Sequence, residues 1–193
     1  MPAVEAAPPT AQPGNTMAAL LGETFKTLLF ALVLYLVISG LTDRVRVENV
    51  SMQPTLSEGE LLVVYTLAYH FGEPHRGDII VFHRNRQPPE DYIKRVIGLP
   101  GDLVVVRDGL VQINGITLDE PYIAQPPAYS GEWQVPPDSL FVLGDNRNRS
   151  SDSRVWGFVP MSDVVGRAVL IYWPPSEVRL LSHADLLGQA ATP

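Results

Sequence analysis

The chain has 193 residues, 46% of them hydrophobic and 18% charged, and its formal net charge is −7. This composition is typical of a globular protein that can bury a core, and the acidic balance argues against a nucleic-acid partner. The absence of cysteine excludes disulfides, a thiol nucleophile and a thiolate metal site. The four histidines lack the spacing of metal ligands, so we expect no metal and no other cofactor.

The N-terminal part combines a Pro- and Ala-rich segment with an apolar run. Residues 1–24 are predicted to form a disordered tail. Residues 25–41 are apolar except for Lys26 at their edge, and 17 residues is the lower limit for a membrane-spanning helix. We therefore predict a membrane anchor over residues 25–42. A cleaved signal peptide and a buried core helix are the alternatives. The flanking charges do not fix an orientation, and the start codon, Met1 or Met17, stays open.

From residue 43 to residue 193 the pattern changes to short β-type runs separated by turn residues. The dipeptides Asp108-Gly109 and Asn114-Gly115 favour two-residue hairpin turns, which predicts a hairpin insertion at about residues 102–140. Only residues 183–191 are predicted to be helical. The fold class is therefore mainly β, an antiparallel sheet preceded by one transmembrane helix. The predicted strands are residues 45–50, 60–65, 78–83, 92–99, 103–106, 110–113, 116–118, 139–143 and 164–173.

Ser51 lies between Val50 and Met52 in the apolar stretch of residues 47–56, and Pro54 stiffens the backbone just after it. Taken alone, this serine has three interpretations: a nucleophile, a helix cap or a plain loop residue. Whether Ser51 is a nucleophile depends on whether the chain provides a base that can activate it.

Lys94 is the only lysine outside the predicted anchor region. Strand alternation places it on one face with Tyr92 and Val96, and Ile93 on the other. Burial on that face would lower the pKa of the lysine, because the charged ammonium loses its water. On Lys94 alone, an exposed lysine of an edge strand is the simpler interpretation.

Residues 143–160 form a third notable stretch, L-G-D-N-R-N-R-S-S-D-S-R-V-W-G-F-V-P. A polar surface loop is the simplest interpretation. However, a loop this dense in aspartate and arginine beside aromatic residues more often orders itself by ion pairs or carries function.

Four blocks in this order resemble bacterial type I signal peptidases, a family of serine proteases with a Ser-Lys dyad. The blocks are V-S-M-Q-P-T-L, R-G-D-I-I-V-F, Y-I-K-R-V-I-G-L-P-G-D and the stretch of residues 143–160. The resemblance covers about residues 25–173 and includes the single N-terminal anchor. It implies a membrane-anchored endopeptidase that removes signal peptides from exported preproteins, with residues 43–193 as its catalytic domain.

The resemblance also implies the roles of individual residues. Ser51 would be the nucleophile and Lys94 the general base, a Ser-Lys variant of the serine protease triad. The backbone N–H of Ser51 would donate to the oxyanion. Some members place a serine two residues before the nucleophile as second donor, and this chain has Asn49 there, whose amide is one candidate. The implied supporting contacts are Ser150 to Lys94, Asp145 to Arg95 and Asp152 to Arg154.

The implied substrate is an extended signal peptide with small residues at positions −1 and −3, bound in shallow apolar pockets. Candidates for the pocket wall are Met52, Leu56, Tyr92 and Ile93, and ordinary core packing is the alternative for each. The implied partners are signal peptides, the lipid bilayer and a nearby export machinery. The catalytic domain would lie on the outer face of the cell membrane.

Two other functions compete with this interpretation. A self-cleaving repressor would also use a Ser-Lys pair, but such proteins are soluble and bind DNA. A membrane-anchored β-domain that only binds partners would not need the paired serine and lysine blocks.

Overall fold

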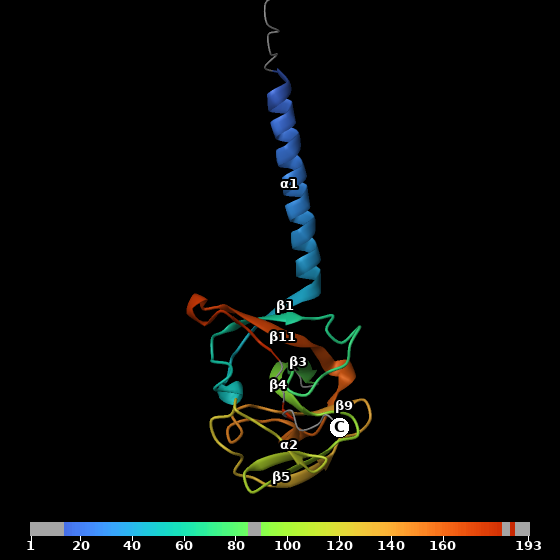
Figure 1. The fold of residues 1–193 in the computed structure, drawn as a ribbon, viewed down its shortest axis with the longest axis vertical. Helices are drawn as coiled ribbons and strands as arrows, with labels where there is room; N and C mark the ends of the chain where they lie inside the picture. The colour runs from blue at the N-terminus through green and yellow to red at the C-terminus, as the bar shows by residue number, and fades with distance from the viewer. Residues whose placement is uncertain (1–13, 85–89, 183–185, 188–193) are drawn as a thin grey trace, which may run out of the picture. The chain divides into compact units, whose positions relative to one another are not determined.

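The computed structural model describes residues 14–84, 90–182 and 186–187, and the chain divides into two compact units, residues 1–40 and 41–193. The helix α1, Gly14–Leu41, makes up the described part of the first unit (Figure 1). It begins before the predicted anchor, so the prediction of a disordered tail is wrong for residues 14–24. Strong helix formers such as Ala18, Ala19, Leu20 and Leu21 extend the helix upstream. Residues 1–13 of the predicted tail lie outside the described residues.

Helix α1 has the length and composition of a membrane-spanning helix. Met17–Leu41 provides 25 residues, and within it an 18-residue stretch has a mean hydropathy of 2.0 and is not buried at all. At about 1.5 Å per residue this stretch spans about 37 Å, more than the hydrocarbon core of a bilayer. The large apolar side chains are exposed, including Phe25 and Phe30. A buried core helix is therefore excluded.

The second unit contains two antiparallel sheets, which confirms the predicted fold class. The larger sheet has the order β1-β2-β11-β3-β4-β9-β10, with β12 beside β11, and the smaller has the order β7-β6-β5-β8. The larger sheet consists of β1 (Thr42–Arg46), β2 (Leu61–Tyr65), β3 (Ile79–Arg84), β4 (Glu90–Gly98), β9 (Ser139–Leu143), β10 (Val159–Pro160), β11 (Val164–Trp173) and β12 (Arg179–Leu180). The smaller consists of β5 (Leu103–Arg107), β6 (Leu110–Ile113), β7 (Ile116–Thr117) and β8 (Gly131–Gln134).

Short helical segments connect the strands. They are the 3₁₀ helices η1 (Val50–Met52), η2 (Met161–Asp163) and η3 (Pro175–Glu177) and the helix α2 (Ser153–Trp156). The predicted strand at residues 45–50 is thus replaced by β1, a short loop and the start of η1. The predicted C-terminal helix at residues 183–191 lies outside the described residues, apart from Leu186 and Leu187.

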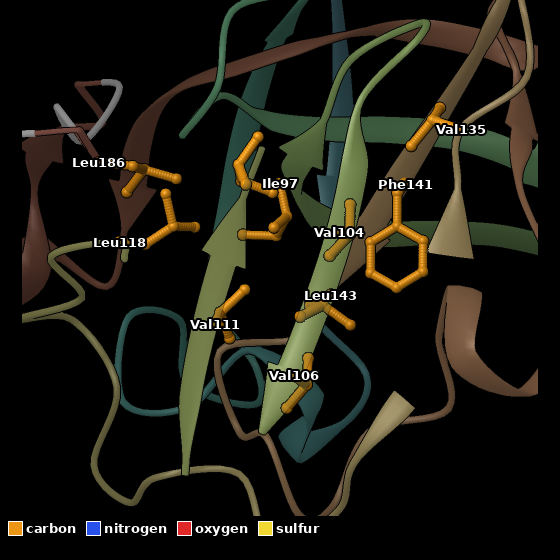
Figure 2. Packing of buried hydrophobic residues seen from close by; sticks show 10 residues of the cluster. Ile97, Val104, Val106, Val111, Leu118, Val135, Phe141, Leu143 and Leu186 are labelled. Carbon is orange, nitrogen blue, oxygen red and sulfur yellow. The ribbon is translucent and has the colours of Figure 1, made fainter. Parts of the chain in front are cut away.

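The smaller sheet is built on the two predicted hairpin turns. Asp108 and Gly109 have φ angles of 52° and 77°, and Asn114 and Gly115 have 51° and 84°, as two-residue hairpins require. Figure 2 shows one core cluster to which both sheets contribute, with Ile97 from β4 and strand residues of β5, β6 and β9. This packing fixes the end of β4 that follows the predicted active-site residues.

Strand β4 follows the alternation expected from the sequence. Tyr92 and Val96 pack in one core cluster, whereas Ile93 packs against another. Lys94 lies between Tyr92 and Val96 in β4, and it pairs with Ile80 of β3. The lysine backbone is therefore held by the centre of the larger sheet.

Candidate active site

Ser51 is held by a short loop that is fixed on both sides. It is the middle residue of η1, and its side chain is nearly buried, with 7% of the residue exposed. The backbone N–H of Asn146 donates to the Ser51 carbonyl at 3.0 Å, and the Asn146 side-chain amide donates to the Val50 carbonyl at 3.1 Å. These two bonds attach the serine loop to the polar loop of residues 143–154, which is 96 residues away in sequence.

Lys94 directs its amine at the serine. Its Nζ lies 2.8 Å from the Oγ of Ser51 and also donates to the Ile93 carbonyl at 2.8 Å. Only 2% of the residue is exposed, so the interpretation as an exposed edge lysine is wrong. The reason is that its side chain packs against Ser51 of η1 and lies close to Asp145 and Asp152 of the polar loop.

The environment of Lys94 favours its neutral form. Burial lowers the pKa of Lys94 from 10.5 to about 8, and the charges of Asp152 and Asp145 act against that decrease. With this pKa about a tenth of the amine is neutral at pH 7 and about half at pH 8, and only this neutral form can accept a proton.

Two arginine–aspartate pairs hold the polar loop beside the lysine. Arg95 contacts Asp145 through Nε at 2.8 Å and through a terminal nitrogen at 2.6 Å, and both side chains are buried. Arg154 binds Asp152 in the same two-pronged way, at 2.6 Å and 2.8 Å. The carboxylate of Asp152 also accepts from the backbone N–H groups of Arg154 and Gly144, which caps α2 and fixes the loop. The structure thus brings together both pairs expected from the sequence.

Ser150 does not contact Lys94 in the way expected. Its Oγ is buried and has no hydrogen-bond partner among the described residues. A Cβ added at Gly144 would collide with both this Oγ and the Ser51 carbonyl, so both serines crowd the same side of this glycine. The hydrogen bonds of the Lys94 Nζ go to the Ser51 Oγ and the Ile93 carbonyl.

Asn49 also differs from its expected role. Its side-chain Oδ1 accepts a hydrogen bond from the Ser51 N–H at 3.1 Å, as an N-cap of η1. The amide oxygen, and not the amide nitrogen, therefore faces the backbone donor expected to serve the oxyanion.

A groove of about 750 Å³ opens onto the serine and lies between β1 and β4. Among the described residues, residues 43–46 of β1 pair with no strand but β2, and residues 90–94 of β4 pair with no strand but β3, so each of these segments has one edge without a strand partner. The groove contains three of the predicted pocket residues, Met52, Tyr92 and Ile93. It is lined by residues 44–49, Ser51, Met52, His83 and residues 90–93.

Leu56 requires a correction. It was expected in the pocket wall, but it is fully buried in a core cluster with Val47 and Leu62 and does not line the groove. Its backbone N–H donates to the Met52 carbonyl, and this turn points the leucine inward.

Sequence reasoning missed the contribution of residues distant from the four blocks. Glu120 and Tyr122, which contact Arg147 and Arg95, lie in a Pro-rich stretch without a recognisable pattern. Asn146 lies in the stretch of residues 143–160, but no local sequence pattern predicted its hydrogen bonds to the serine loop. No group of three His, Asp or Glu side chains in the described part of the chain is placed to hold a metal ion.

Residues 21–173 match the family model described as signal peptidase, peptidase S26. The chain belongs to this family. The signal peptidase I of Leptolyngbya laminosa is 46% identical over 178 residues, which cover 86% of this chain and 88% of that protein. The signal peptidase I of Bacillus caldolyticus is 44% identical over 143 residues, which cover 66% of this chain and 78% of that protein. A solved signal peptidase I of Enterococcus faecalis is 37% identical, covers 50% of this chain and 97% of its own, and has a TM-score of 0.46.

Membership confirms the resemblance that the four sequence blocks indicated. The protein is a hydrolase, a serine peptidase anchored in a membrane, and its reaction is the removal of signal peptides from preproteins. The geometry around Ser51 and Lys94 can now be considered in terms of that reaction.

Proposed function

We propose that Ser51 is the nucleophile and Lys94 the general base of signal peptide removal. The observation that carries this proposal is the 2.8 Å contact between the Oγ of a nearly buried serine and the Nζ of a buried lysine. A serine hydroxyl is a weak nucleophile without an adjacent base. A lysine can act as that base when burial lowers its pKa, here to about 8.

The reaction proceeds in two halves. Neutral Lys94 accepts the hydroxyl proton while Oγ of Ser51 attacks the scissile carbonyl. The protonated Lys94 then gives its proton to the departing amine of the mature protein, which leaves the signal peptide esterified to Ser51. In the second half Lys94 takes a proton from water, the hydroxide attacks the ester, and the proton returns to Oγ. The Arg95–Asp145 and Arg154–Asp152 pairs hold the surrounding loop and keep its charges balanced.

The oxyanion donor is the backbone N–H of Ser51, and substrate binding must release it from Asn49. The carboxamide of Asn49 competes with the substrate carbonyl for this N–H as long as its Oδ1 faces the donor. Rotation of that side chain frees the backbone N–H and turns the amide nitrogen towards the oxyanion. Asn49 would then contribute the second donor.

The substrate lies extended in the groove between β1 and β4. Two free strand edges on opposite walls allow a peptide to add as a strand and to form backbone hydrogen bonds. Met52, Tyr92 and Ile93 supply the apolar wall close to the serine, where small side chains at −1 and −3 are accommodated. Ser150 would support Lys94 after a small side-chain movement from its unpartnered position.

The anchor keeps this site at the membrane surface where exported preproteins emerge. We place the catalytic unit on the outer face of the cell membrane, with the lipid bilayer around α1 and the export machinery nearby. The support for this placement is the apolar helix at the N-terminal side of the catalytic unit together with the substrate class.

Cleavage of a purified preprotein in detergent by Ser51→Ala and Lys94→Met tests the proposal. Both variants are expected to lose at least about 10³-fold in kcat, because nucleophile and base act as a unit. Lys26→Met is the matched control, since it removes the only other lysine, an exposed one paired with Glu23. Wild-type turnover by Ser51→Ala or by Lys94→Met would rule out the dyad.

A further inference from the structure

Residues 119–129, here called the strap, pack against the polar loop that supports the dyad. The side chain of Asn148 binds the strap twice, accepting from the Ala128 N–H at 2.8 Å and donating to the Pro126 carbonyl at 3.0 Å. The guanidinium of Arg154 lies 3.8 Å from the ring centre of Tyr129. The Pro-rich stretch therefore contacts the functional loop along much of its length.

Tyr122 extends the strap to the residue next to Lys94. The guanidinium of Arg95 lies 4.0 Å from the centre of the Tyr122 ring, and that of Arg147 lies 5.7 Å from it. Cations at these distances from an aromatic face are attracted by its negative charge distribution, more strongly when they are buried. The ring thus lies over the guanidinium of the Arg95–Asp145 pair.

Glu120 neutralises Arg147, a buried arginine that donates a hydrogen bond to the backbone of the polar loop. Arg147 donates to both carboxylate oxygens of Glu120, at 2.7 Å and 2.8 Å, and its side chain is fully buried. The Tyr122 hydroxyl donates to the same carboxylate at 2.9 Å, and burial raises its pKa, so it stays protonated. On its other side, Nε of Arg147 donates to the Gly144 carbonyl at 3.1 Å. Gly144 in turn is pressed against the Ser51 carbonyl.

The charges of the buried network around the polar loop balance only when Glu120 is included. The groups that face this region come from β4, the polar loop, the strap and η1. Arg95 balances Asp145, and Arg154 balances Asp152, but Arg147 has its carboxylate on the strap. The charged and titratable groups concerned are Lys94, Arg95, Tyr92, Asp145, Arg147, Asp152, Arg154, Glu120, Tyr122 and Tyr129.

We propose that Glu120 and Tyr122 are positioning residues for the peptidase reaction: they fix Gly144 through Arg147 and cancel the buried charge of Arg147 in the loop that supports the dyad. This inference rests on the proposed roles of Ser51 and Lys94. It makes the strap a part of the active site and not merely a connection in the inserted sheet.

The pH dependence of kcat/KM in the full-length Glu120→Gln variant tests the charge balance. Without the carboxylate, the positive charge of Arg147 is uncompensated and disfavours the charged form of Lys94. The acidic limb should move to lower pH by about 0.5 unit or more relative to wild type. Glu132→Gln is the matched control, because it removes an exposed carboxylate from β8, the strand that follows the strap, and should leave the limb unchanged.

The double variant Glu120→Gln/Arg147→Met separates electrostatics from packing. This variant lacks both charges, so the acidic limb of its kcat/KM profile should return to the wild-type pH. A purely structural role of Glu120 predicts no such return. Its kcat should fall about tenfold at similar KM, because Gly144 has lost its donor. A limb that stays unchanged in Glu120→Gln, or a wild-type kcat in the double variant, would overturn the proposal. If Glu120→Gln does not fold, the kcat of the double variant decides the question alone. An acidic limb in the wild type that is not that of a lysine would instead overturn the dyad.

Discussion

At the scale of single residues, the site depends on what surrounds the amine of Lys94. Burial disfavours the ammonium, while Asp145 and Asp152 favour it, and burial prevails, leaving a pKa of about 8. Both carboxylates are themselves paired with arginines, which limits their effect on the lysine. A lysine base near neutral pH thus requires a dry site in which the nearby negative charges are already compensated.

Asn49 gives a prediction at the same scale. If its amide assists the oxyanion, Asn49→Ala should lower kcat at least about tenfold with KM similar, a loss typical of one oxyanion donor. Asn49→Asp retains an acceptor for the Ser51 N–H but cannot donate, and its negative charge should make it worse than alanine. Steady-state kinetics on a preprotein distinguish the two roles. An aspartate variant as active as wild type would leave Asn49 as a cap alone.

At the scale of elements, the proposed mode of substrate binding depends on β1 and β4. Their free edges face the groove, and an added strand offers its N–H groups to one side at every second residue. In the proposed binding mode, substrate side chains near Ser51 would meet Met52 and Ile93, so we expect selection to concentrate close to the cleaved bond.

Substrate peptides methylated at single backbone nitrogens test this arrangement. Methylation at the positions that donate to β1 or β4 should raise KM about tenfold, the cost of one lost hydrogen bond together with its unsatisfied acceptor. Methylation at the intervening positions should change KM about twofold or less. An effect that is equal at all positions would be incompatible with strand addition.

At the scale of the whole molecule, the anchor and the catalytic unit are separate compact units. Every residue assigned to the site belongs to residues 41–193, and the Leu41 carbonyl accepts hydrogen bonds from Thr66 of that unit. A chain that starts at Leu41 is therefore expected to fold.

This truncated chain should cleave a short soluble signal peptide with kcat/KM within about threefold of the full chain. Its cleavage of a preprotein in lipid vesicles should fall about tenfold or more, because the anchor no longer raises the local concentration of enzyme at the membrane. The comparison requires only parallel rate measurements on the two substrates. Loss of activity on the soluble peptide would show that α1 contributes to the site itself.

The sequence allowed the antiparallel fold, both hairpin turns and the dense polar loop to be predicted, because each depends on local patterns. Lys94 showed the limit of such patterns, since periodicity assigned its face but not its burial. Leu56 was misplaced because a single turn points it into the core, and the contacts of Ser150 and Asn49 depend on side-chain rotations that no local pattern encodes. Glu120 lies 27 residues from Arg147 in a stretch without periodicity, so no local sequence pattern predicted their ion pair.

The most direct test of the central claim, that Lys94 is the base, is the pH dependence of kcat/KM for wild-type enzyme. Activity requires neutral Lys94, so it should fall as the pH decreases through the pKa of the lysine, with the midpoint of the acidic limb at about 8. A midpoint near 4–5 would instead assign the essential base to a carboxylate and contradict the account.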